Sequence, residues 1–240
     1  MITLTTSLSP SINRFNHQLK AIKSWRELGF EITSLNHVKD ISELVNTDLA
    51  SEYSKHGVKF IPTERGLIEE NRRFVFIDEL INLATKISRT AFIINSDIIL
   101  KDKRKIEEII NKAQQSLVFV SRYNYDNKIE ECSIEKFGLD IFVFNSDFRK
   151  LIPPSTFVIG KPLWDYWIPY HFALTQTPIF SIHDKVAFHK NHPKAWNIED
   201  WKKMAPNFRQ YEHLKNLGNK ELSKTVRNTI ISKIQIVSAL

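Results

Sequence analysis

Apolar and polar residues form alternating blocks along the first half of the chain, and the blocks have two different periods. Short runs of apolar or β-branched residues predict buried strands. They occupy residues 2–8, 31–36, 58–62, 90–94 and 117–121. The longer segments between them predict helices, two from apolar residues at helical spacing and two from polar or charged character. They cover residues 12–28, 74–87, 38–56 and 102–114.

Serine, proline and glycine residues at the ends of the predicted segments support these boundaries. Ser9-Pro10-Ser11 precedes the first helical segment, where serine can cap and proline fits the first turn. Gly29 follows that segment and predicts its C-terminal end. Strands that alternate with helices predict βαβ units and a mostly parallel sheet. Fully apolar strands fit burial on both faces, and ligands of such sheets bind beyond the carboxyl ends of the strands.

The rhythm changes after residue 121. Residues 139–144 predict another strand, and 180–182 and 186–188 are shorter strand-like pieces. The segment from about 207 to 237 predicts helix. Since the chain contains no internal repeat and no low-complexity linker, we expect one α/β catalytic domain over residues 1–204 and a helical extension over 205–240.

The predicted extension carries one apolar stripe with basic residues among it. The stripe consists of Leu214, Leu217, Leu222, Val226, Ile230, Ile234 and Val237. Such a stripe mostly packs on its own domain or on a second subunit, which is the favoured interpretation. A basic amphipathic helix can also lie on an anionic membrane, so oligomer formation and peripheral membrane contact both stay open.

Composition narrows the partners. The 240 residues carry a net charge of +7, which favours anionic ligands such as nucleotide phosphates. The basic residues are spread along the chain without a dense block, so a nucleic-acid partner is not expected. The chain has one cysteine and neither a long apolar run nor a basic leader before an apolar one, and we therefore expect a cytoplasmic protein.

The triplet Asn95-Ser96-Asp97 directly follows the apolar run 90–94. A carboxylate at the end of a buried strand can hold a divalent cation, and the cation can neutralise charge on a leaving diphosphate. Taken alone, the same triplet more often forms a turn that closes a strand.

Two histidines three residues apart, His189 and His192, follow the apolar piece 186–188. One imidazole could bind a metal while the other bonds a phosphate. A polar turn with solvated imidazoles explains the same spacing equally well.

Aromatic residues flank a carboxylate at Trp164-Asp165-Tyr166-Trp167. The rings of Trp164 and Trp167 could stack on a sugar, or they could pack into the core, which is the more frequent outcome. Asp165 could deprotonate an acceptor hydroxyl. Asp140 interrupts the apolar strand 139–144 and needs a polar partner, either an acceptor sugar or a neighbouring backbone group.

In this order, the motifs resemble those of glycosyltransferases of the nucleotide-diphospho-sugar transferase superfamily over roughly residues 2–196. The resemblance is carried by the triplet at 95–97 and by the segments 137–144, 160–167 and 189–192. It implies a GT-A fold and a nucleotide-sugar donor. It also implies a divalent cation, Mn²⁺ or Mg²⁺, at the triplet.

The resemblance also implies roles for individual residues on the donor side. Asp97 would be the metal-binding carboxylate, with His189 or His192 reaching the metal or the diphosphate. Asn95 and Ser96 would complete the donor-binding triplet. Thr5 and Thr6, in the first strand, would lie near the nucleotide.

On the acceptor side, Asp165 would be the catalytic base, and Asp140, Trp164 and Trp167 would contact a glycan or small-molecule acceptor. One departure from the family pattern is Asn95, which stands where the first Asp of the triplet is usual and lacks its charge. A catalytically inactive nucleotide-sugar-binding protein therefore remains one alternative. A nucleotidyltransferase is another, although residues 7–16 lack the glycine-rich loop that such an enzyme requires.

Overall fold

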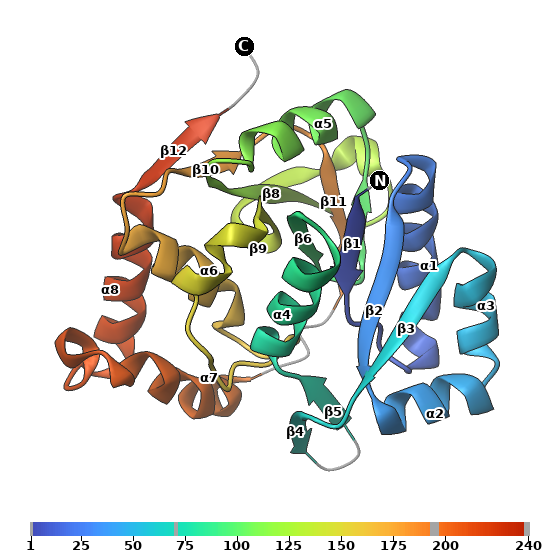
Figure 1. The fold of residues 1–240 in the computed structure, drawn as a ribbon, viewed down its shortest axis with the longest axis horizontal. Helices are drawn as coiled ribbons and strands as arrows, with labels where there is room; N and C mark the ends of the chain where they lie inside the picture. The colour runs from blue at the N-terminus through green and yellow to red at the C-terminus, as the bar shows by residue number, and fades with distance from the viewer. Residues whose placement is uncertain (1, 70–71, 193–196, 238–240) are drawn as a thin grey trace.

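The computed structural model describes residues 2–69, 72–192 and 197–237. These residues form a mixed sheet of ten strands at the centre of the fold. Eight strands follow one another in the order β12-β10-β8-β9-β6-β1-β2-β3 (Figure 1). They are β1 (Thr3–Thr6), β2 (Glu31–His37), β3 (Val58–Thr63), β6 (Thr90–Ile94), β8 (Leu117–Tyr125), β9 (Ser133–Asn145), β10 (Ile179–Ile182) and β12 (Ile234–Val237). Short strands β7 (Ile98–Leu100) and β11 (Ala187–Lys190) pair beside this path.

Most neighbouring strands are parallel. Strands β3, β2, β1 and β6 form one parallel group, and β8, β10 and β12 form a second. Strand β9 lies between the groups and is antiparallel to both β6 and β8. The two groups therefore run in the same direction, and their carboxyl ends meet at one edge of the sheet. The predicted α/β class with a mostly parallel sheet is confirmed.

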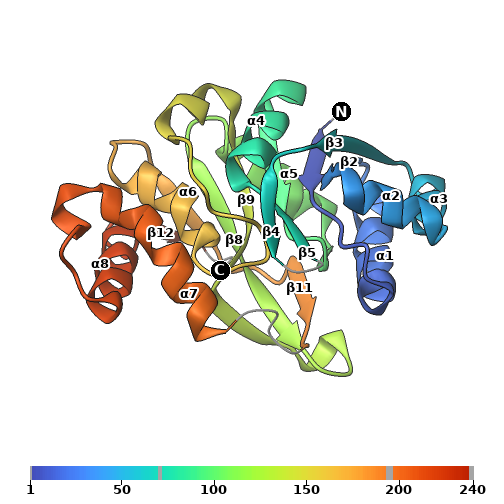
Figure 2. The same cartoon turned by 90° about the horizontal axis from the view of Figure 1, so that it is seen from below.

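Helices cover both faces of the sheet, as Figures 1 and 2 show. Side chains of α1 (Ile12–Glu27), α2 (Val38–Asn46), α3 (Leu49–Lys55) and α5 (Lys103–Lys112) belong to one core cluster. Those of α4 (Ile77–Ile87), α6 (Trp164–Ala173) and α8 (Asn219–Ile231) belong to the other. Residues 91–94 of strand β6 are all apolar because both faces of the strand are buried. Ala91 and Ile93 belong to one core cluster, and Phe92 and Ile94 belong to the other.

Smaller elements complete the described chain. A two-stranded ribbon, β4 (Gly66–Glu69) and β5 (Arg72–Val75), stands apart from the main sheet. Helix α7 (Ile198–Met204) precedes two of the four 3-10 turns, which are η1 (Ile129–Glu131), η2 (Ser146–Leu151), η3 (Ala205–Gln210) and η4 (Glu212–Leu214). The predicted helix over 38–56 is divided into α2 and α3 at Asp48, which has a φ of 58°.

The predicted continuous helix over 207–237 is wrong. The segment forms two 3-10 turns, helix α8 and then strand β12, which extends the main sheet by pairing in parallel with β10. Gly218 stands at the N-terminal cap of α8 and ends the preceding turns there. The β-branched residues of β12 suit a strand, and residues 238–240 of the predicted extension lie outside the described residues.

Helix α8 packs on the same domain. Its buried residues Leu222, Val226 and Ile230 belong to the core cluster that also contains residues of α4 and α6. No helix among the described residues is long and apolar enough to cross a membrane. The division at residue 204 into a domain and an extension stays a prediction.

Candidate functional site

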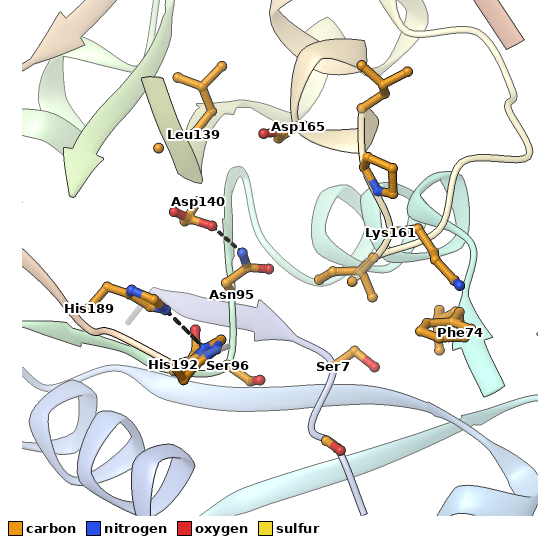
Figure 3. A pocket seen from close by; sticks show the side chains of 18 of the residues that line it. Ser7, Phe74, Asn95, Ser96, Leu139, Asp140, Lys161, Asp165, His189 and His192 are labelled. Carbon is orange, nitrogen blue, oxygen red and sulfur yellow. Dashed lines mark hydrogen bonds and ion pairs between the residues drawn. The ribbon is translucent and has the colours of Figure 1, made fainter. Parts of the chain in front are cut away.

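A cavity of about 1060 Å³ lies at the carboxyl edge of the sheet (Figure 3). Its walls come from the loop after β1, the triplet after β6, strands β5, β8, β9 and β11, the start of α6, and helices α1, α2, α7 and α8. The parallel strand groups explain the convergence, because each strand that ends at this edge delivers its next residues to the same space.

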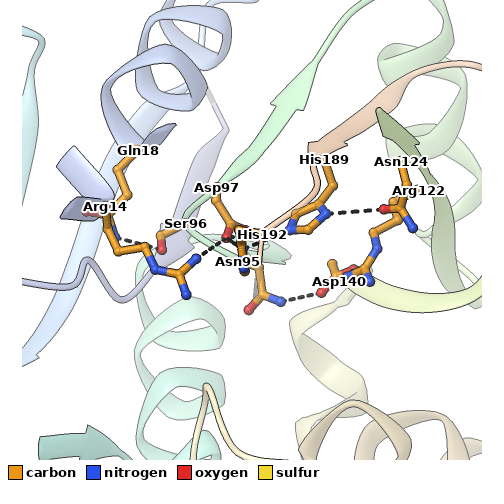
Figure 4. Close-up of polar contacts among 10 residues, drawn as sticks. All are labelled: Arg14, Gln18, Asn95, Ser96, Asp97, Arg122, Asn124, Asp140, His189 and His192. Atoms are coloured by element: carbon orange, nitrogen blue, oxygen red, sulfur yellow. Dashed lines mark hydrogen bonds and ion pairs between the residues drawn. The ribbon is translucent and has the colours of Figure 1, made fainter. Parts of the chain in front are cut away.

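The triplet that follows β6 opens onto this cavity. The Asn95 backbone N–H donates to the Asp140 carbonyl at 2.9 Å, and the Asn95 side-chain amide donates to the Asp140 carboxylate. Arg122 of β8 holds the other oxygen of Asp140 in an ion pair (Figure 4). Asp140 therefore has protein partners on both oxygens, and Asn95 serves to hold it.

Asp97 meets both predicted histidines. Its Oδ2 lies 3.0 Å from His192 Nε2 and 3.7 Å from His189 Nε2, and the two Nε2 atoms are 3.2 Å apart (Figure 4). Burial opposes the charge on Asp97, but hydrogen bonds to the two imidazoles outweigh it and hold the pKa of Asp97 well below its usual range. The carboxylate is therefore ionised at neutral pH.

These three side chains form a donor set that fits a divalent cation. Asp97, His189 and His192 offer ligand atoms that all lie within 4.8 Å of one another. His189 Nδ1 lies 3.2 Å from Asn124 Oδ1, which can only accept a hydrogen bond, so Nδ1 carries the proton. With Nδ1 engaged by Asn124, Nε2 is the nitrogen of His189 that faces Asp97 and His192 and can bind a cation.

Helix α1 closes the other side of the triplet. Arg14 Nη1 lies 3.8 Å from Asp97 Oδ2. Gln18 is buried, and in the amide orientation that satisfies all its neighbours it accepts from Ser9 N at 2.8 Å and from Ser96 Oγ at 2.9 Å. The same amide donates to Tyr53. Gln18 therefore links Ser96 of the triplet to Ser9 of the loop after β1.

Thr5 and Thr6, predicted near the nucleotide, do not line the cavity. Both are fully buried inside β1, where neighbouring strands and both helical layers enclose them. The next residues, 7–11, line the cavity instead. Asn36 of β2 fixes this loop, since its amide donates to the Leu8 carbonyl at 2.6 Å.

Asp165 lines the cavity from the first turn of α6. Burial, followed by the nearby Asp140 carboxylate, raises the pKa of Asp165 to about 7. A carboxyl group with that pKa can accept a proton near neutral pH.

Trp164 and Trp167 are in the core and not in the cavity. Trp164 is 4% exposed and packs edge-on to Phe142, while Trp167 is fully buried against Phe157 and Phe208. Of the two alternatives that the sequence left open, packing of the two rings into the core is the one observed. Helical geometry explains the separation, since residues 164 and 167 lie on one face of α6 and Asp165 is turned away from it.

Several cavity residues were not anticipated from the sequence. Arg14 and Gln18 come from α1, Arg122 and Asn124 come from β8, and the four form no short motif. Asp40, which is buried, and Arg73 also line the cavity and form an ion pair at 3.1 Å. The one sequence signal for these cavity residues is their position near the ends of predicted strands and helices.

A buried lysine joins three parts of the cavity wall. Lys161 Nζ lies 2.5 Å from Asp200 of α7 and 2.6 Å from Glu69 of β4. It also lies over the ring of Phe74 in β5, 4.8 Å from the ring centre. This Lys161 cluster connects the β4–β5 ribbon, the loop before α6, and α7.

Comparison with known proteins gives a likeness of fold. No protein-family model and no curated protein matches the sequence. Among solved structures, Staphylococcus aureus TarS residues 1–349 in complex with UDP-GlcNAc matches with a TM-score of 0.55 and 8% identity, over 95% of this chain and 71% of that one. The same fragment in complex with UDP matches with a TM-score of 0.55 and 10% identity, over the same shares. Against longer TarS the TM-score is 0.53 at 8% identity, and this chain spans 43% of that one. The protein therefore shares the Rossmann-like α/β fold of this part of TarS.

Proposed function

We propose that this protein is a glycosyltransferase that moves a sugar from a nucleoside-diphosphate donor to a hydroxyl acceptor. One observation carries the proposal: a donor set that fits a divalent cation and a carboxyl group with a pKa of about 7 face the same cavity at the carboxyl edge of the sheet. The two features suit the two halves of a transfer reaction, which are departure of a diphosphate and deprotonation of a hydroxyl group.

The donor side is formed by Asp97, His189 and His192. A divalent cation held there would supply positive charge beside the leaving diphosphate. Arg14, at 3.8 Å from Asp97, adds a fixed cation to the same region. The UDP-GlcNAc and UDP bound by TarS, which has the same fold, support a nucleoside diphosphate as the ligand.

The Asp40–Arg73 pair is the candidate contact for the nucleobase. The pair and the loop after β1 line the same cavity, and both side chains of the pair are largely shielded from solvent. A carboxylate accepts a ring N–H and a guanidinium donates to a ring carbonyl, so the pair suits a base such as uracil that presents both.

Asp165 is the proposed base. In its ionised form it would accept the proton of the acceptor hydroxyl as that oxygen attacks the anomeric carbon, and direct displacement of this kind inverts the anomeric configuration. The acceptor would enter from the side of α6 and α8, where Tyr166, Ser223 and Arg227 also line the cavity. Asp140 is held by Asn95 and Arg122, so it contributes negative charge near Asp165.

Titration of UDP-GlcNAc or UDP into the protein, with and without Mn²⁺, tests the donor side. The unmodified protein should bind either ligand more tightly with the cation. Asp97→Asn should abolish that dependence, because it removes the carboxylate charge of the donor set. Cation-dependent binding that survives Asp97→Asn would contradict the site assignment.

The same measurements separate the alternatives. A nucleotide-sugar-binding protein without activity would bind the donor but release no UDP from UDP-GlcNAc in the presence of acceptors. A nucleotidyltransferase would instead consume a nucleoside triphosphate and a sugar phosphate and form diphosphate.

A further inference from the structure

The ligand atoms around Asp97 are unusual for a magnesium site, since nitrogen predominates over oxygen. The candidate set contains two imidazole nitrogens and one carboxylate. Mg²⁺ and Ca²⁺ take oxygen ligands, whereas imidazole suits transition ions. Building on the proposed function, we infer that this is a transition-metal site, which binds Co²⁺ or Zn²⁺ more tightly than Mn²⁺, and Mn²⁺ more tightly than Mg²⁺ or Ca²⁺.

The imidazoles are arranged to bind through nitrogen. Asn124 Oδ1 lies 3.2 Å from His189 Nδ1 and can only accept, so Nε2 is the nitrogen of His189 that is left to bind a cation. That atom and His192 Nε2 are 3.2 Å apart, with Asp97 Oδ2 3.0 Å from the second. Three potential ligand atoms this close share a common point of approach for a cation.

The second nearby carboxylate is engaged elsewhere. Asp140 accepts from the side-chain amide of Asn95 with one oxygen and pairs with Arg122 through the other. The hydroxyl of Ser96 bonds to Gln18. Within the described residues, the triplet therefore supplies a single carboxylate to the cluster, which is a poor match for an ion that needs several hard oxygen ligands.

Three protein ligands leave coordination positions open, as in catalytic zinc sites that bind substrate or water. All three side chains line the cavity, so those positions face the space where the donor is proposed to bind. A third imidazole adjoins the site: the ring centre of His17 is 6.4 Å from that of His192.

Isothermal titration of the chelator-treated 240-residue protein with each cation alone, without nucleotide, tests the inference. Mn²⁺ should bind about tenfold or more tightly than Mg²⁺, with Co²⁺ and Zn²⁺ tighter still, following ligand preference and the Irving–Williams order. His189→Gln should remove most of that preference by weakening Co²⁺, Zn²⁺ and Mn²⁺ binding. His56→Gln, which changes a histidine at the end of α3 outside the cavity lining, should leave all affinities unchanged.

Equal affinity for Mg²⁺ and Mn²⁺ would overturn the inference, as would unchanged Co²⁺ binding in His189→Gln with native circular dichroism. Neither result requires nucleotide, so both are independent of the proposed function. Selective Co²⁺ binding with no affinity for UDP or UDP-GlcNAc, with or without the cation, would instead refute the proposed function and uphold the metal site.

Discussion

At the residue scale, Asp165 links burial to a pH-dependent rate. Burial and the Asp140 carboxylate raise its pKa to about 7, so the fraction able to act as a base increases as pH rises through that value. We expect kcat/KM for sugar transfer to increase from about pH 6 to about pH 8. Asp165→Asn should lower kcat by about 10²–10⁴-fold and leave UDP affinity near that of the unmodified protein.

The pH dependence of stability has the opposite sign. A carboxyl group whose pKa is raised on folding stabilises the fold at low pH, and this contribution is lost as pH rises from the unfolded value through about 7. Asp165→Asn lacks this titration. The free energy of unfolding of the variant, relative to that of the unmodified protein, should therefore increase as pH rises through about 7. A rate profile that is flat in this range, with intact UDP binding, would argue against Asp165 as the base.

A second residue-scale prediction concerns Asn124. Its amide oxygen fixes the tautomer of His189 without joining the proposed donor set. Asn124→Ala should weaken Co²⁺ binding by about 10–100-fold, as is typical for partners behind a metal ligand. Asn191→Ala is the matched control, because that amide lines the cavity but bonds to Asp126, and its titration should be unchanged. Equal losses in both variants would indicate a general effect on the cavity.

At the element scale, the Lys161 cluster holds the β4–β5 ribbon, the loop before α6, and α7 together. The side chain is 5% exposed, and burial opposes its charge, but hydrogen bonds to Asp200 and Glu69 keep the pKa of Lys161 raised. Lys161→Met would leave two shielded carboxylates without this partner. The free energy of unfolding should decrease by about 3–5 kcal/mol in a urea titration.

Lys203→Met provides the comparison, since Lys203 binds the same Glu69 but is 61% exposed. Its loss should cost about 1 kcal/mol or less, because solvent screens exposed ion pairs. If the two variants lose equal stability, the cluster does not act as a buried connection.

At the scale of the whole molecule, the C-terminal segment belongs to the core. Ile230 is 2% exposed, and its neighbour Ile231 is 42% exposed on the same helix. Ile230→Ala should lower the free energy of unfolding by about 2–5 kcal/mol, whereas Ile231→Ala should stay within about 0.5 kcal/mol. Thermal or urea unfolding of the two variants measures the difference, and similar values would mean that α8 is only loosely attached.

The sequence by itself determined the sheet and the main chemical groups. Apolar runs flanked by helical periods predict βαβ units because burial on both faces demands continuous apolar strands, and residues 90–94 are such a run. The same pattern located Asp97 at a strand end, and the spacing of His189 and His192 marked a second polar cluster. These are local features, and local sequence carries them.

Tertiary structure decided which of those groups meet. His189 reaches Asp97 because β11 pairs with both β7 and β8, a contact between segments about ninety residues apart that no local pattern encodes. Burial places Trp164 and Trp167 in the core and not against a sugar. Thr5 and Thr6 are also buried, and the loop that follows them lines the cavity in their place. Strand β12 formed where a helical stripe was predicted, because an unpaired edge of the sheet was available beside β10. Pairing and burial depend on the whole fold, and for that reason the sequence alone left them undecided.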